Sequence, residues 1–160
     1  MDPLGEQLRE AMRRWPTGVA VVTSRMGDQA HGMTVGSLVS ISLDPPCVVV
    51  TLANDTRTHR LVLESGVFGV TMLNEGQASL SDRFAGRSSE SGDRLAGLEL
   101  FQLESGVPLL RKGLAALDCR VIHRYELPHS TLFVGQVLAA VKLEPGQPLV
   151  YLNREYHLLL

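Results

Sequence analysis

Cysteine is scarce in this sequence, and its scarcity limits the kinds of site that the chain can build. Only two cysteines, Cys47 and Cys119, occur among the 160 residues. They lie far apart, each within an apolar run, and neither belongs to a CxxC pair or a Cys/His cluster, so we predict no metal site. We expect both to be small buried side chains in a reducing compartment. Because the first residues are polar and lack the pattern of a secretory signal, we predict a cytoplasmic protein.

Aromatic residues and net charge are also low. Aromatics make up 5% of the chain and the formal net charge is −2 at pH 7. Such a chain has neither the stacking surface nor the positive field that nucleic acids and anionic membranes require. No apolar stretch approaches the roughly 20 residues of a membrane span. We therefore expect no nucleic-acid partner and no membrane partner.

Several nucleotide-binding and hydrolase motifs are missing. The chain contains no GxGxxG, no GxxxxGK[ST] and no GxSxG. Strands and helices do not alternate at the regular spacing of βαβ units, which excludes a Rossmann domain.

Short β-branched runs dominate instead. They predict strands over residues 18–24, 32–43, 47–52, 67–73, 131–143 and 149–152, with a further strand around 117–121. Short helices are predicted over residues 1–15, 59–65 and 75–84, and an exposed, mobile loop over 86–97. This pattern favours one domain over residues 1–160, an antiparallel barrel with peripheral helices.

One of these strands is unusually rich in hydroxyl groups. Thr34, Ser37, Ser40 and Ser42 lie in one short window beside Gly36. Small hydroxyl residues next to glycine let a flat ligand approach the backbone and bond at its edge. The alternative is an edge strand with a solvated Ser/Thr face, and spacing alone leaves both interpretations open.

The stretch from Asn54 to Thr58 has the groups that a phosphate needs. Thr56 and Thr58 supply hydroxyls and Arg57 supplies a cationic fork. The predicted helix that follows adds free backbone N–H groups. An ordinary helix cap with one surface arginine is the alternative.

The order and spacing of short motifs along the chain resemble the flavin reductase-like family, the short NAD(P)H:flavin oxidoreductases of two-component monooxygenases. The resemblance runs from about Ala11 to His157. The matching motifs are PTGV (16–19) with VVTS, GMT (32–34), SISLDPP (40–46), LS (80–81), FAG (84–86), GVP (106–108), TLFVG (131–135), PLVY (148–151) and YH (156–157).

The resemblance implies a single-domain Greek-key split β-barrel that is mainly β with short helices. It further implies a homodimer with flavin bound near the subunit interface. By this likeness, the residues that line the isoalloxazine ring and ribityl chain are Met33, Thr34, Val35, Gly36, Ser37, Leu38 and Ser40. Those that bind the phosphate are Asn54, Thr56, Arg57 and Thr58, and the helix predicted over 75–84 contributes Phe84 and Ala85.

The nicotinamide side is expected at Tyr156 and His157 and in the segment before the 131–143 strand. Many relatives carry Gly-Asp-His there, whereas this chain reads Pro128-His129-Ser130. Ser130 occupies the aligned position and His129 lies one residue earlier. A shift of one residue on an extended segment reverses the side-chain direction. Both His129 and Ser130 are therefore predicted nicotinamide contacts, and the choice between them stays open.

The resemblance implies an NAD(P)H-dependent flavin reductase that supplies reduced FMN or FAD to a partner monooxygenase or another acceptor. The expected ligands are FMN or FAD, with NADH or NADPH as co-substrate. No catalytic side chain is predicted, because the flavin itself accepts the hydride. The alternative is a split-barrel carrier of flavin or heme without nicotinamide turnover. A barrel acting only as an interaction module would leave the hydroxyl-rich segments unexplained.

Overall fold

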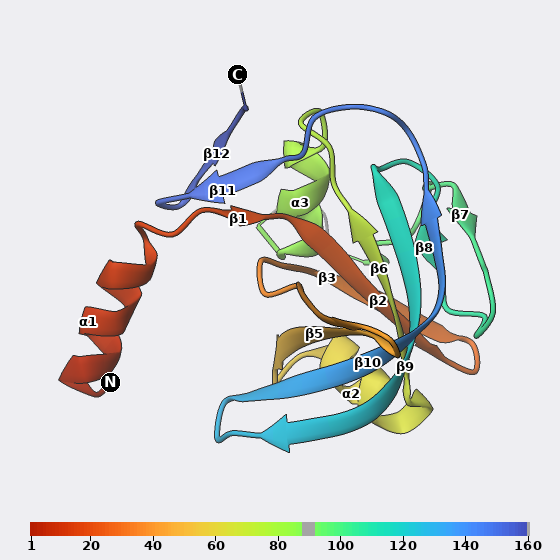
Figure 1. The fold of residues 1–160 in the computed structure, drawn as a ribbon, viewed down its shortest axis with the longest axis horizontal. Coiled ribbons are helices and arrows are strands. Elements are labelled where there is room, and N and C mark those ends of the chain that lie inside the picture. The colour runs from red at the N-terminus through yellow and green to blue at the C-terminus, as the bar shows by residue number, and fades with distance from the viewer. Residues whose placement is uncertain (88–91, 160) are drawn as a thin grey trace.

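The computed structural model describes residues 1–87 and 92–159, and β-strands dominate the fold (Figure 1). The strands are β1 (Thr17–Gly18), β2 (Ala20–Met26), β3 (Gln29–Val35), β4 (Val39–Leu43), β5 (Pro46–Ala53), β6 (Val67–Met72), β7 (Leu100–Phe101), β8 (Leu109–Leu110), β9 (Ala115–Glu126), β10 (Ser130–Lys142), β11 (Val150–Leu152) and β12 (Glu155–His157). The helices are α1 (Pro3–Met12), α2 (Arg57–Ser65) and α3 (Ala78–Phe84).

The main sheet has seven antiparallel strands in the order β3-β2-β6-β9-β10-β5-β4. The long β9–β10 hairpin lies at its centre (Figure 1). Helix α2 packs mainly against β2 and β3 and also touches β5. A smaller sheet of β1, β11 and β12 joins the two ends of the chain. The predicted class is confirmed: the chain is mainly antiparallel β with short helices, in a split-barrel fold.

Two apolar clusters fill the interior. The first lies inside the main sheet around Val50, Phe68 and Phe133, each with no exposed surface. The second lies between β2, α3 and β11, around Phe84 and Leu149. The β-branched runs supply most of the buried side chains because they pack well on a pleated surface.

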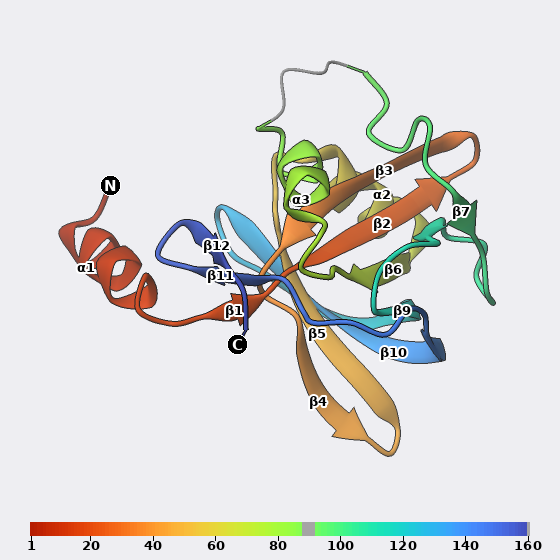
Figure 2. The same ribbon diagram turned by 90° about the horizontal axis from the view of Figure 1, so that it is seen from above.

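The prediction of a single strand over 32–43 is wrong, because the structure has two strands there, β3 and β4. Residues 36–38 leave the first strand and cross to the other edge of the sheet. The hydroxyl of Ser37 accepts a hydrogen bond from the Thr51 amide at 2.9 Å and so ties this crossing to β5. β4 is thereby an edge strand that projects from the body (Figure 2).

The helix ends predicted from local sequence signals agree with the structure at some termini and differ at others. Gly66 closes α2 in the left-handed conformation with φ 73°, as predicted, but Thr56 caps the helix, so that it starts at Arg57, two residues before the predicted start. α1 ends at Met12, three residues before the predicted end, and buries none of its residues. α3 begins at Ala78 and not at Glu75, because the Asn74 carboxamide accepts a hydrogen bond from the Gly76 amide in a turn.

The loop predicted over 86–97 is only partly exposed. Residues 88–91 lie outside the described residues, so that part of the prediction is untested. Leu95 is buried and joins the second cluster. The Arg94 guanidinium donates to the carbonyl oxygens of Gly32 and Phe84 at 3.0 and 3.1 Å. These contacts attach residues 94 and 95 to the body, contrary to the expected exposure.

Cys47 and Cys119 are free and buried, as expected. Burial raises the pKa of the Cys119 thiol to about 12, and Asp118 and Cys47 add to the shift. This thiol is therefore unreactive at neutral pH. Within residues 1–87 and 92–159, no helix has the length and apolar character needed to cross a membrane.

Candidate flavin site

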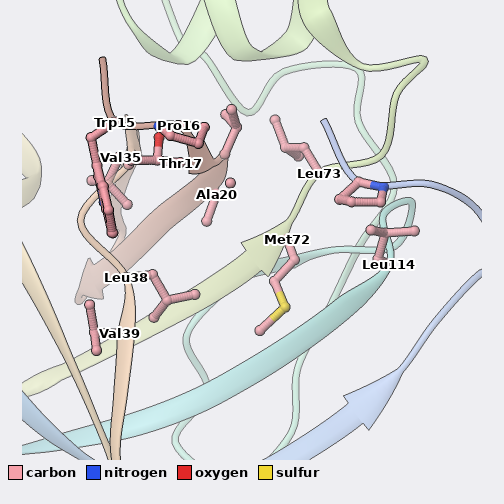
Figure 3. Close-up of a pocket in the computed structure, with 14 residues that line it drawn as sticks. Trp15, Pro16, Thr17, Ala20, Val35, Leu38, Val39, Met72, Leu73 and Leu114 are labelled. Atoms are coloured by element: carbon pink, nitrogen blue, oxygen red, sulfur yellow. The ribbon is translucent and has the colours of Figure 1, made fainter. Parts of the chain in front are cut away.

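An apolar cavity of about 370 Å³ opens between the start of β2 and the crossing from β3 to β4 (Figure 3). The close-up shows Trp15, Thr17 and Val35 on one side and Leu73 and Leu114 on the other. The full lining is Trp15, Pro16, Thr17, Gly18, Val19, Ala20, Val35, Gly36, Leu38, Val39, Met72, Leu73, Leu114 and Pro148.

A second cavity of about 150 Å³ shares a wall with the first. The common wall is formed by Thr17, Gly18, Val19, Val35 and Gly36. A Cβ atom on Gly36 would lie 2.8 Å from the Thr17 hydroxyl. Any side chain at this position would therefore collide with Thr17, so glycine is what allows the two segments to pack closely in the wall between the cavities.

The second cavity has polar groups that the first lacks. Thr34, Ser81, Ala85, Arg87, Tyr151 and Tyr156 complete its lining. The Tyr156 hydroxyl donates to Asp82 Oδ1 at 2.6 Å and lies 2.8 Å from the Ser81 hydroxyl. Burial and the bond to the Asp82 carboxylate raise the pKa of Tyr156, so the phenol stays protonated.

Arg87 completes the polar rim of this second cavity. Its guanidinium lies 5.7 Å from the centre of the Tyr151 ring and donates to the Tyr151 hydroxyl at 3.3 Å. The bond to Tyr151 is the main reason that the pKa of Arg87 is raised. A second contact, 3.7 Å to Asp82, holds the same cation near Tyr156. One cavity is thus apolar, and the other combines aromatic rings with a fixed cation.

The predicted ring-binding segment lies largely in these two cavities. Val35, Gly36 and Leu38 line the first, and Thr34, Val35 and Gly36 line the second. Met33 is half-buried and packs against the first apolar cluster. In this segment, therefore, backbone and apolar atoms form most of the surface that faces the cavities.

The hydroxyl groups of this segment are mostly bonded within the protein. Thr34 donates to the Ser81 carbonyl at 2.6 Å, and Ser37 is bonded to the backbone of Thr51. Ser40 lies on the exposed edge strand β4, opposite Val48. The hydroxyls of Thr34 and Ser37 thus position the backbone of the segment. The role of Ser40 in ligand binding stays a prediction.

A third, open cavity of about 390 Å³ lies at the N-terminal end of α2. Asn54, Asp55, Thr56, Arg57, His59, Arg60 and Leu63 line it. Arg57 is exposed and forms no ion pair within the described part of the chain. Thr56 caps the helix by accepting from the His59 amide at 3.2 Å. The Arg57 guanidinium and the backbone N–H groups of Arg57 and Thr58 are therefore available to an anion.

Two residues of the predicted phosphate segment have other partners. Thr58 is fully buried, and its hydroxyl lies 2.9 Å from Nδ1 of His31. The side chain of Asn54 bonds to the Leu127 carbonyl and to the Thr131 hydroxyl. Both side chains are thus directed into the protein. The Thr56 hydroxyl is also engaged, since it donates to the Ala53 carbonyl at 2.8 Å and accepts from the His59 amide. Arg57 is therefore the best-placed side chain of the set.

Phe84 and Ala85 contribute in different ways. Phe84 is fully buried, and a Cβ atom on Gly32 would lie 2.9 Å from its ring, so it packs α3 against β3. Ala85 is exposed and lines the second cavity. Only Ala85 therefore reaches the cavity surface.

The predicted nicotinamide residues form two separate groups. His129 and Ser130 lie at the tip of the β9–β10 hairpin, and Tyr156 and His157 lie on β12, at the opposite end of the same face (Figure 1). His129 is exposed, and Tyr156 lines the second cavity. His157 is exposed and lies 3.9 Å from Glu155.

Sequence reasoning did not assign Thr17, Ser81, Arg87 or Tyr151 to the site, although each lines a cavity. The motifs PTGV and PLVY contain Thr17 and Tyr151. These motifs supported the resemblance, and their pairing through β1 and β11 is what brings them to the second cavity. Arg87 carried no signal in the sequence.

Comparison with known proteins agrees with this geometry. The family described as "Flavin reductase like domain" matches residues 12–159. The reductase component of an FADH(2)-dependent resorcinol hydroxylase from Rhizobium sp. is 38% identical over 157 residues, covering 97% of this chain and 87% of the relative. The NADH-dependent flavin reductase StyB from Pseudomonas fluorescens is 36% identical over 152 residues, covering 93% and 86%.

A solved structure agrees as well. The styrene monooxygenase flavin reductase from Pseudomonas putida S12 superposes with a TM-score of 0.83 at 34% identity, covering 96% of this chain and 97% of that one. The chain thus matches this flavin reductase in both sequence and fold over almost its whole length. The chain belongs to the flavin reductase-like family and shares its split-barrel fold and its flavin oxidoreductase activity.

Proposed function

We propose that the two joined cavities hold the isoalloxazine ring and ribityl chain of FMN or FAD, and that NADH reduces this flavin. The wall shared by the two cavities carries the proposal, because it places an apolar cavity and a cavity with polar groups side by side at Gly36. Apolar residues on one side and Tyr156 and Arg87 on the other suit a ring that is apolar on its faces and polar at its edge.

The phosphate of the flavin is proposed to bind at the N-terminal end of α2. Arg57 supplies a charge that no described acidic side chain neutralises, and the first turn supplies backbone donors. The cavity at this end is open, which suits a phosphate that keeps part of its hydration.

The chain's own residues have a positioning role in the reaction. Bound flavin supplies the hydride-accepting chemistry, so the protein needs no acid–base pair. The wall at Gly36 and the apolar lining orient the ring and exclude water, and Tyr156, fixed by its bond to Asp82, forms the edge of the second cavity. The nicotinamide contacts at His129, Ser130, Tyr156 and His157 are part of this proposal.

The reduced flavin is proposed to pass to a partner oxygenase. The Rhizobium and Pseudomonas relatives are reductases that work with a hydroxylase or an oxygenase. The open cavities of the present chain are consistent with a flavin that can leave after reduction. Two free, buried cysteines are consistent with the predicted cytoplasmic location.

A homodimer is part of the same proposal. Leu4, Leu8 and Met12 of α1, and Trp15 just after it, are 52–67% exposed and recur at helical spacing. On β4, Val39, Ile41 and Leu43 are also exposed. Figures 1 and 2 show α1 standing apart from the body.

An isolated helix of this length is marginal in water, and monomers rarely expose so much apolar surface. A second copy packed on α1 would stabilise the helix. It would also cover Trp15, which lines the first cavity. The second copy would thus help to close the flavin site.

Titration of the protein with FMN and FAD tests the function. Flavin fluorescence should be quenched with a Kd in the micromolar range or below, about −8 kcal/mol, and NADH should then be oxidised. If flavin binds but neither NADH nor NADPH is oxidised, the chain is a carrier. If neither flavin binds at millimolar concentration, the site assignment is wrong.

A further inference from the structure

The tip of the β9–β10 hairpin is bonded to the N-terminal end of α2 by a short series of hydrogen bonds. Asn54 donates from its backbone amide to the His129 carbonyl at 3.0 Å. Its side-chain Nδ2 donates to the Leu127 carbonyl at 2.8 Å. Asn54, which lies shortly before α2, thus bonds to both sides of the hairpin tip. The tip is formed by Pro128 and His129.

The directions of these bonds follow from the groups involved. The Leu127 carbonyl can only accept, so the NH₂ group of Asn54 must face it. Oδ1 of Asn54 then faces the Thr131 hydroxyl, which donates to it at 2.7 Å. A hydroxyl has one proton, so the 2.9 Å contact between Thr131 and Nε2 of His59 requires His59 to donate.

His59 anchors this series of bonds in the core. It is buried, and its ring centre lies 5.7 Å from that of Phe133, which has no exposed surface. Burial lowers the pKa of His59, so the ring is neutral with its proton on Nε2. Thr131 is 1% exposed, and water cannot readily replace the bonds of its hydroxyl.

We propose that His59, Thr131 and Asn54 form a hydrogen-bonded relay that positions His129 relative to the phosphate-binding turn at Thr56 and Arg57. These three are positioning residues, because none of them needs to touch the ligand. The inference rests on the proposed function, in which the hairpin tip contacts the nicotinamide. It also gives Asn54 a role different from that of a phosphate ligand.

The relay links the two binding segments through rigid parts of the fold. Thr131 lies in β10 opposite Leu52 of β5, and Asn54 directly follows β5. A buried hydroxyl between them therefore sets the distance from the tip to α2. Loss of that hydroxyl leaves a donor on His59 and an acceptor on Asn54 unpaired, which favours movement of the tip.

Thr131→Val tests the relay, with Thr131→Ser as the matched control. Valine keeps the shape and removes the hydroxyl, whereas serine keeps the hydroxyl. We expect the amide of Asn54 to exchange at least about tenfold faster in the valine variant. The KM for NADH should rise about threefold or more while kcat and the flavin Kd change little. The serine variant should match the wild type in all of these.

Asn54→Ala is a second variant at a half-buried position, in case Thr131→Val folds poorly. It should raise the KM for NADH in the same way and speed exchange of the tip amides. The relay is wrong if both variants leave tip exchange and the KM as in the wild type. Faster exchange with an unchanged KM would refute its positioning role. If the wild type oxidises no NADH, the proposed function fails, and amide exchange alone decides whether the relay exists.

Discussion

The Nδ1 atom of His31 lies 2.9 Å from the hydroxyl of Thr58, and this contact joins β3 to the first turn of α2. Both side chains are buried. Burial, with added repulsion from Arg94 and Arg57, lowers the pKa of His31 to about 4 from an ordinary value of 6.5. The ring is therefore neutral at neutral pH, and it holds the helix end that is proposed to bind phosphate.

This contact predicts a loss of stability in acid. In the unfolded chain His31 takes up a proton near pH 6.5, whereas in the folded protein it does so only near pH 4. The unfolded state therefore binds more protons between these values, and the free energy of unfolding should fall as the pH falls through them. Urea unfolding at several pH values between 6.5 and 4 measures how steeply the free energy of unfolding depends on pH.

His31→Asn is the control for that slope. Carboxylates also titrate in acid, so the slope of the free energy of unfolding against pH must be compared between the wild type and the variant. The variant should be less stable near neutral pH, and its stability should depend less on pH between 6.5 and 4. Equal slopes in the two proteins would show that His31 does not have the lowered pKa.

Replacement of Arg57 tests the phosphate site. Arg57→Ala should weaken FMN binding by about 1.5–3 kcal/mol, because a charge-assisted contact is lost. Riboflavin lacks the phosphate and should bind as before. Arg60→Ala is the matched control, since Arg60 lines the same cavity but lies 3.9 Å from Glu64. Fluorescence titration with both ligands gives the comparison, and an equal loss for FMN and riboflavin would place the phosphate elsewhere.

The hairpin tip offers two candidate nicotinamide contacts, and the structure leaves His129 the more exposed of them. His129→Ala should raise the KM for NADH or slow hydride transfer, with flavin affinity unchanged, because the ring would touch only the second ligand. Ser130→Ala should then have little effect. Steady-state kinetics with NADH separate the two residues. The reverse result would assign the contact to Ser130, and no effect from either would leave Tyr156 and His157.

The exposed face of α1 predicts the oligomeric state. Sedimentation should give about twice the chain mass of 17.4 kDa. Leu8→Lys should shift the protein toward monomer, because it places a charge in the apolar face. Gln7→Lys adds the same charge beside that face and should leave the dimer intact. A wild-type monomer at micromolar concentration that still reduces flavin would contradict a site completed by the second copy.

The sequence by itself determined the elements whose signals are local. The β-branched runs became strands because their side chains pack on a pleated surface. α2 ends at Ser65, as predicted, because the left-handed conformation of Gly66 depends only on neighbouring residues. The order of the motifs also sufficed to assign the family, since the match extends over residues 12–159.

The tertiary structure alone decided which side chains reach the site. Thr34 and Ser37 carry hydroxyls as the sequence shows, but both are bonded to backbone from distant segments. The Thr58 hydroxyl faces His31, and Asn54 bonds across to Leu127 and Thr131. Each of these partners lies in a different segment of the chain, at least 14 residues away. Local sequence patterns cannot predict such contacts, because strand pairing and sheet curvature bring the groups together.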